Sequence, residues 1–108
     1  VMTISDLTPS NVPAGPNGSA VQNRFTLTTE IEIKVGASRL ENRVEILLEI
    51  DTGDACFWSF DTPVTTSGAN KGFRVSRNEF ISIPCGPNQP VYIISNGSSN
   101  IIVAERAE

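Results

Sequence analysis

A regular alternation of apolar and polar residues over positions 25–35 limits most tightly what this chain can fold into. Odd positions carry apolar side chains or threonine, whereas even positions carry threonine, glutamate or lysine. Successive side chains of a β-strand point to opposite faces of a sheet, so this period predicts a strand with one wet face. Gly36 ends the run, and a bend near Thr29 would divide it.

The rest of the chain repeats the pattern in shorter runs that turns separate. Residues 44–51 alternate, and the side chains predicted to point inward are those of Val44, Ile46, Leu48 and Ile50. Further strands are predicted at residues 55–61, 73–76, 80–85, 91–95 and 101–105. Many short strands with close turns and no helical pattern predict an all-β fold. We expect an antiparallel β-sandwich, jelly-roll-like, with seven or eight strands.

The first 20 residues differ in composition from everything that follows. Prolines and glycines are mixed there with serine and asparagine, a composition that favours neither helix nor strand. We therefore divide the chain into an extended N-terminal arm, residues 1–20, and a sandwich domain, residues 21–108. A free terminus is the default for such a segment. The interpretation we favour is an arm that lies on a neighbouring subunit through Pro9, Val12 and Pro13.

Composition argues against several classes of function. The net charge is −4 and the eight basic residues are scattered, whereas nucleic-acid binding needs a concentrated positive patch. No apolar run approaches the roughly 18 residues of a membrane helix, and nothing resembles a signal peptide. The chain has no histidine, the commonest general base and zinc ligand. We expect no cofactor, no metal, no nucleic acid and no membrane partner.

Two cysteines, Cys56 and Cys85, lie in predicted strands. Free cysteine is among the most buried residue types, so two small buried apolar side chains are the simplest interpretation. A disulfide stays open, because a sandwich can bring two strands together and spacing alone does not decide it.

Several strands are apolar on both faces, which a sheet with one wet face does not need. The residues on the unexpected face, and hence the interface candidates, are Phe57, Phe80, Tyr92, Ile94 and Ile102. One interpretation is that loops or the arm cover these strands. The other is an apolar surface buried against another subunit, which exposed patches of this kind usually indicate. Both can hold in one assembly.

Two motifs suggest other functions. Residues 51–53, Asp-Thr-Gly, resemble the active-site signature of dimeric aspartic proteases, in which Asp51 of each copy would share one proton. Asp54 follows where a small residue is favoured, and no glycine-rich flap appears, so this is a remote alternative and we expect no catalytic residues. Trp58 and Tyr92 would suit a sugar-stacking platform, which makes a carbohydrate-binding module the nearer alternative.

From about Leu40 to Glu105 the order of features resembles a small β-sandwich of tailed-bacteriophage virion proteins. The matching segments are residues 42–50, 51–55, the aromatic run 57–60, 63–66 with Gly68, 79–83, 90–97 and 103–105. Arg77 and Asn78 depart from it, since a glycine is expected before Glu79.

The resemblance implies a structural protein rather than an enzyme, most simply a capsid decoration (cement) protein. It also implies a homo-oligomer, with a trimer favoured, that binds the major capsid protein or other virion subunits. The expected location is the particle surface, the head before the tail, after synthesis in the host cytoplasm.

Overall fold

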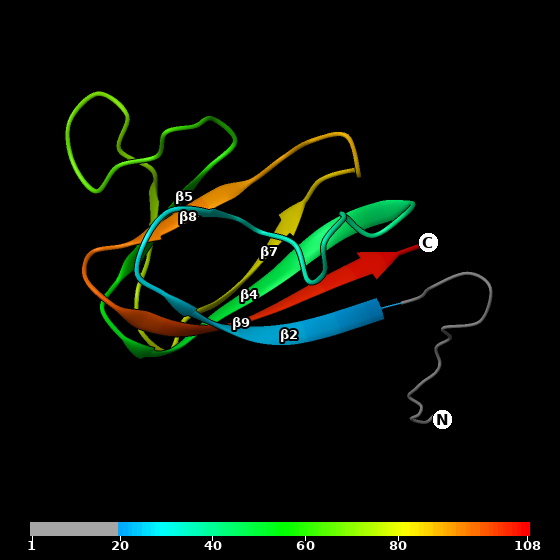
Figure 1. The fold of residues 1–108 in the computed structure, drawn as a ribbon, viewed down its shortest axis with the longest axis horizontal. Helices are drawn as coiled ribbons and strands as arrows, with labels where there is room; N and C mark the ends of the chain where they lie inside the picture. The colour runs from blue at the N-terminus through cyan, green and yellow to red at the C-terminus, as the bar shows by residue number, and fades with distance from the viewer. Residues whose placement is uncertain (1–19) are drawn as a thin grey trace.

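Eight strands in two antiparallel four-stranded sheets make up residues 20–108, the part of the chain that the computed structural model describes (Figure 1). The strands are β2 (Ala20–Leu27), β3 (Ile31–Glu32), β4 (Arg43–Gly53), β5 (Cys56–Ser59), β6 (Phe73–Val75), β7 (Phe80–Pro84), β8 (Tyr92–Ser95) and β9 (Ser99–Ala107). One sheet has the order β2-β9-β4-β7 and the other β3-β8-β5-β6. The described residues contain no helix.

The first strand pairs with the last, β2 with β9, and the pairing continues inward along the chain: β3 with β8, β4 with β7 and β5 with β6. This nested pairing over two sheets is that of a jelly roll. The predicted all-β sandwich is therefore confirmed. Pro9, Val12 and Pro13 lie outside the described residues, and their predicted contacts stay predictions. Ala20, which we assigned to the arm, is the first residue of β2.

The alternating run at residues 25–35 serves both sheets. Strand β2 ends at Leu27, the chain crosses over near Thr29, and β3 begins at Ile31 in the other sheet (Figure 1). The odd-numbered residues were predicted to point inward, and this is true on both sides of the crossing, because Leu27 and Ile33 are fully buried. The periodicity predicts the buried face, and the bend near Thr29 divides it between two sheets.

Strand β4 departs from prediction at its first residues. Ile46, Leu48 and Ile50 are fully buried as predicted, but Val44 is only partly buried. The register with β9 shifts between Arg43 and Glu45, so Val44 has no partner in the ladder. Such a bulge re-aims the neighbouring side chains. The predicted inward position of Val44 is therefore wrong. The neighbouring residue, Arg43, has the buried side chain.

A buried ion pair lies where β4 begins and β9 ends. Nη1 of Arg43 donates to Oε2 of Glu105 at 2.7 Å, and both side chains are almost completely buried. The same carboxylate accepts hydrogen bonds from the backbone N–H of Val35, at 2.9 Å, and of Leu40, at 3.2 Å. Glu105 thus fixes the loop that leads from β3 to β4.

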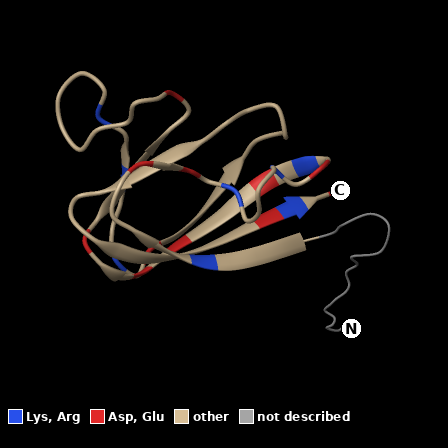
Figure 2. Cartoon of the chain, viewed as in Figure 1, with Lys and Arg blue, Asp and Glu red and all other residues tan. Residues whose placement is uncertain are grey.

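The second terminal nitrogen of Arg43 fixes another loop. Nη2 donates to the backbone carbonyl of Gly86 at 3.0 Å and to that of Gln89 at 2.7 Å. Two connections that are distant in sequence are therefore held by one arginine and one glutamate. Acidic and basic residues gather at this end of β4 and β9 (Figure 2).

Candidate interaction surfaces

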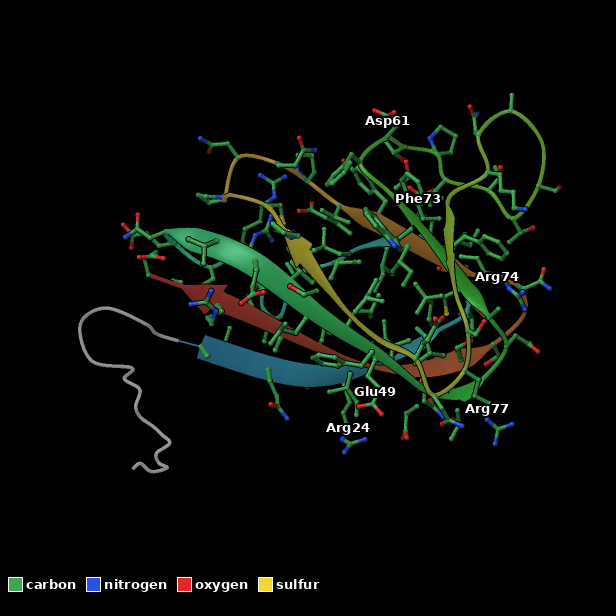
Figure 3. The ribbon with its side chains drawn as sticks, turned by 180° about the vertical axis from the view of Figure 1, so that it is seen from behind. Arg24, Glu49, Asp61, Phe73, Arg74 and Arg77 are labelled. Carbon is green, nitrogen blue, oxygen red and sulfur yellow. The ribbon has the colours of Figure 1, made fainter. Side chains whose placement is uncertain are left out.

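The outer face of the β2-β9-β4-β7 sheet combines apolar and charged side chains in rows across the strands. Register places Arg24, Ile102, Glu49 and Phe80 in one row. The adjacent row, two residues along each strand, holds Gln22, Ala104, Leu47 and Ser82. Arg24 and Glu49 lie on this face (Figure 3), on either side of Ile102 in the row.

Four apolar residues of these two rows form what we call the apolar strip: Leu47, Phe80, Ile102 and Ala104. Phe80 is 62% exposed, and the other three are partly exposed. Phe80 and Ile102 were predicted from sequence as interface candidates, and the structure brings them onto one face. Leu47 and Ala104 were missed, because only the pairing of four strands shows that they adjoin.

Charged residues flank the apolar strip. At one end Glu45 accepts hydrogen bonds from Ser82 Oγ and Arg106 Nε. These two bonds, with that from Ser82 the larger cause, hold the pKa of Glu45 below its usual value. At the other end Arg24 lies 3.6 Å from Asp51 in an exposed ion pair.

The lowered pKa of Glu45 predicts a small pH dependence of stability. A carboxylate with a depressed folded-state pKa stabilises the fold above its unfolded pKa of about 4.3, and this is lost as pH falls through the folded pKa. Glu45→Gln should therefore reduce the free energy of unfolding by up to about 1 kcal/mol at neutral pH, as for other exposed pairs. Urea unfolding at a series of pH values measures this. A deficit that stays constant into strong acid contradicts the prediction.

The outer face of the β3-β8-β5-β6 sheet carries the other predicted candidates. Tyr92 and Ile94 are partly exposed there. Phe57 is only 6% exposed, and the Lys71 ammonium lies 5.8 Å from its ring centroid. The chain itself covers Phe57, since the connection between β5 and β6 folds back over it. Phe57 is therefore unsuitable as an interface residue.

An aromatic cluster that sequence reasoning missed lies at one end of this same sheet. The Trp58 ring is 5.2 Å from that of Phe60, in an edge-to-face arrangement, and 4.9 Å from that of Phe73. Phe60 is 40% exposed and Phe73 62%. Trp58 pairs with Phe73 across β5 and β6, a register that the sequence pattern does not supply. We call these three residues the aromatic cluster.

The predicted sugar platform of Trp58 and Tyr92 does not form. Tyr92 pairs with Ser59, and Trp58 pairs with the buried Ile93. Alternating side chains of a strand point to opposite faces, so Trp58 and Tyr92 lie on opposite faces of the sheet. A single sugar ring has no access to both.

Within residues 20–108, strand β2 presents a long edge that no other strand covers. It is the terminal strand of its sheet, has eight residues and is exposed over most of its length. The other terminal strands are protected by shortness or by proline: β3 has two residues, β6 has three, and β7 ends at Pro84. An unprotected edge is a template for pairing with another chain.

The Asp-Thr-Gly segment forms the end of β4. Asp51 faces the guanidinium of Arg24 on its own chain, and Gly53 has φ +98°. Asp54 accepts a hydrogen bond from the Ser98 N–H at 3.2 Å and so stabilises the turn before β9. Asp51 and Gly53 therefore have structural roles at the end of β4.

No cluster suited to a metal ion occurs in residues 20–108, where no three histidine, cysteine or acidic side chains gather. Cys56 and Cys85 are both free thiols. Cys56 is fully buried and Cys85 half-buried, and burial raises the pKa of both thiols. Within the same residues, no helix has the length and apolar character needed to cross a membrane.

No protein-family model matches this sequence, and no curated protein matches it either. Among solved structures, the chain is similar to one from Bacillus endospore appendages, which form a novel family of disulfide-linked pili. The two chains are 18% identical, with a TM-score of 0.50, over 83% of this chain and 85% of the other. The match supports the β-sandwich fold.

Proposed function

We propose that this chain is a non-enzymatic structural subunit that assembles with copies of itself. The observation that carries the proposal is the apolar strip on the outer face of the β2-β9-β4-β7 sheet. Exposed apolar residues that adjoin one another and have a polar rim usually mark an interaction site. Among the described residues, β2 is the terminal strand that borders the same face, and its outer edge has no partner strand there.

The face is large enough for a specific interface. Four strands spaced at about 4.8 Å, with about eight residues at 3.3 Å each, present about 500 Å². Two such faces remove about 1,000 Å² from water, close to the minimum for a stable association. Arg24 and Glu49 lie in the same row and have opposite charges. Two copies that meet through this face can therefore pair these charges, which fixes their register and avoids repulsion between like charges.

The kind of assembly is the finer part of the proposal. The sequence resemblance favours a capsid decoration protein, a trimer on the surface of a phage particle, and the structural neighbour belongs to a pilus. Both are assemblies of repeated subunits. In this chain we expect non-covalent contacts, because Cys56 is fully buried and the pKa of the half-buried Cys85 thiol is raised.

Ile102→Lys tests the role of the apolar strip. A lysine in the centre of the face must lose its hydration when two copies meet, so the average mass at a fixed concentration should fall. Ile94→Lys is the matched control, since Ile94 is also a partly exposed isoleucine of a strand but lies on the opposite sheet. Sedimentation velocity measures both. Equal masses for the two variants would contradict the assignment of this face.

A further inference from the structure

The exposure of the aromatic cluster is explained neither by the packing of the core nor by the proposed interface on the β2-β9-β4-β7 sheet. Two of the four large apolar residues that are exposed in residues 20–108 belong to it, Phe60 and Phe73. Trp58 is partly buried, packs against the core and lies next to both phenylalanine rings. The exposed rings of Phe60 and Phe73 are therefore held in place by the partly buried ring of Trp58.

The aromatic cluster and the first residue of β2 lie at opposite ends of the domain (Figure 3). Phe73 is at the end where the long connection between β5 and β6 projects, and β2 begins at the other end (Figure 3). At about 3.3 Å per residue, Pro13 reaches at most roughly 23 Å from Ala20. The long axis of the domain measures 45 Å. The extended reach of Pro13 is therefore about half of the long axis, which favours the cluster of a second copy as the partner of these prolines.

We propose that the aromatic cluster binds the proline-rich segment of a second copy, residues 8–16, so that copies join head to tail. This rests on the proposed function, since it requires that the chain assembles with itself. The segment reads Thr-Pro-Ser-Asn-Val-Pro-Ala-Gly-Pro, with prolines at positions 9, 13 and 16. Proline-rich segments bind surfaces lined by aromatic rings, because their backbone is already extended and loses little entropy.

The composition of the aromatic cluster suits the uncharged segment 8–16 better than it suits a charged ligand. Residues 8–16 contain no charged side chain, and the three rings of the cluster contain none. Contact between them is therefore apolar and only weakly screened by salt. A head-to-tail contact is heterologous, so it produces open chains or rings rather than closed pairs.

Two complementary variants test the inference, both made in the full chain with Ile102→Lys so that the outer face does not contribute. The first adds Phe73→Ser, which keeps the segment and damages the cluster. The second adds Pro9→Ser, Pro13→Ser and Pro16→Ser, which keeps the cluster and damages the segment. Each variant alone should associate at least about tenfold more weakly than Ile102→Lys, the loss typical of a central aromatic anchor.

Mixing the two variants should restore association but limit it to pairs, because each mixture contains one intact segment and one intact cluster per pair. Sedimentation velocity distinguishes pairs from chains. Phe73 is 62% exposed, so its substitution should move the urea midpoint little, which separates loss of binding from loss of folding.

Three results overturn the inference. The first is that Phe73→Ser associates as strongly as Ile102→Lys, and the second is that mixing restores nothing. The third is that Phe73→Ser weakens binding of a soluble oligosaccharide while leaving self-association unchanged, which would assign the cluster to sugar. In all three cases wild-type association through the outer face still stands. A wild-type chain that never associates overturns the proposed function as well.

Discussion

Glu105→Ala should lower the free energy of unfolding by about 3–5 kcal/mol, the usual loss when one partner of a buried ion pair is removed. The remaining Arg43 guanidinium would be buried without its counter-charge. The backbone N–H groups of Val35 and Leu40 would also lose their acceptor. Urea unfolding of the wild type and the variant measures the loss.

Glu45→Ala is the matched control, because Glu45 also pairs with an arginine across β4 and β9 but at the surface. It should lose only about 0–1 kcal/mol. A double variant, Arg43→Met with Glu105→Leu, should recover part of the loss by replacing the pair with apolar contacts. Losses of equal size for Glu105→Ala and Glu45→Ala would show that the buried pair does not hold the two loops.

Gly53→Ala should destabilise the fold by about 3 kcal/mol, from an unfavourable backbone conformation together with overpacking. Gly53 has φ +98°, which side chains of L-residues rarely adopt. A Cβ atom there would lie 2.3 Å from the carbonyl oxygen of Ser98 and 2.7 Å from the Cα of Ser99. Both are backbone atoms, one in the turn before β9 and the other in the first residue of β9, so relief requires the start of β9 to move away from the end of β4.

Thermal unfolding measures this second effect, and the melting temperature should fall by more than about 10 °C. Gly36→Ala is the control, because nothing lies within 4 Å of a Cβ at Gly36, and its effect should stay within about 0.5 kcal/mol. If Gly53→Ala melted with the wild type, the structural explanation of the Asp-Thr-Gly segment would be wrong.

Periodicity predicted most of the core because it depends on local geometry alone. Ile46, Leu48 and Ile50 are buried, as are Leu27 and Ile33. An alternating apolar side requires no knowledge of which strands pair. The sandwich class was therefore accessible from the sequence, whereas the order of the strands comes from the structure.

The buried charges were not accessible in this way. Arg43 and Glu105 are charged residues, which a hydrophobic pattern does not count as core, and Arg43 is buried beside a bulge that leaves Val44 unpaired with β9. A bulge shifts side chains by one position, and the sequence of β4 contains no glycine before Gly53 to announce it.

The candidate surfaces were predicted only in part, because they depend on contacts between distant segments. Phe80 and Ile102 were identified as apolar on an unexpected face, but their common row requires the pairing of β7, β4 and β9. Phe57 has the same sequence signature and is covered by its own chain near Lys71. An apolar residue on the outer face of a strand indicates that something covers that face. The sequence does not show whether the same chain or another chain covers it.

The mass of the full-length chain in solution, measured by sedimentation across a wide range of concentration, tests the central claim most directly. We predict a mass of more than one copy that rises with concentration, and an Ile102→Lys variant that shifts the distribution toward smaller species. A mass of one copy at every concentration, unchanged by Ile102→Lys, would contradict the proposal that this chain is a subunit of an assembly.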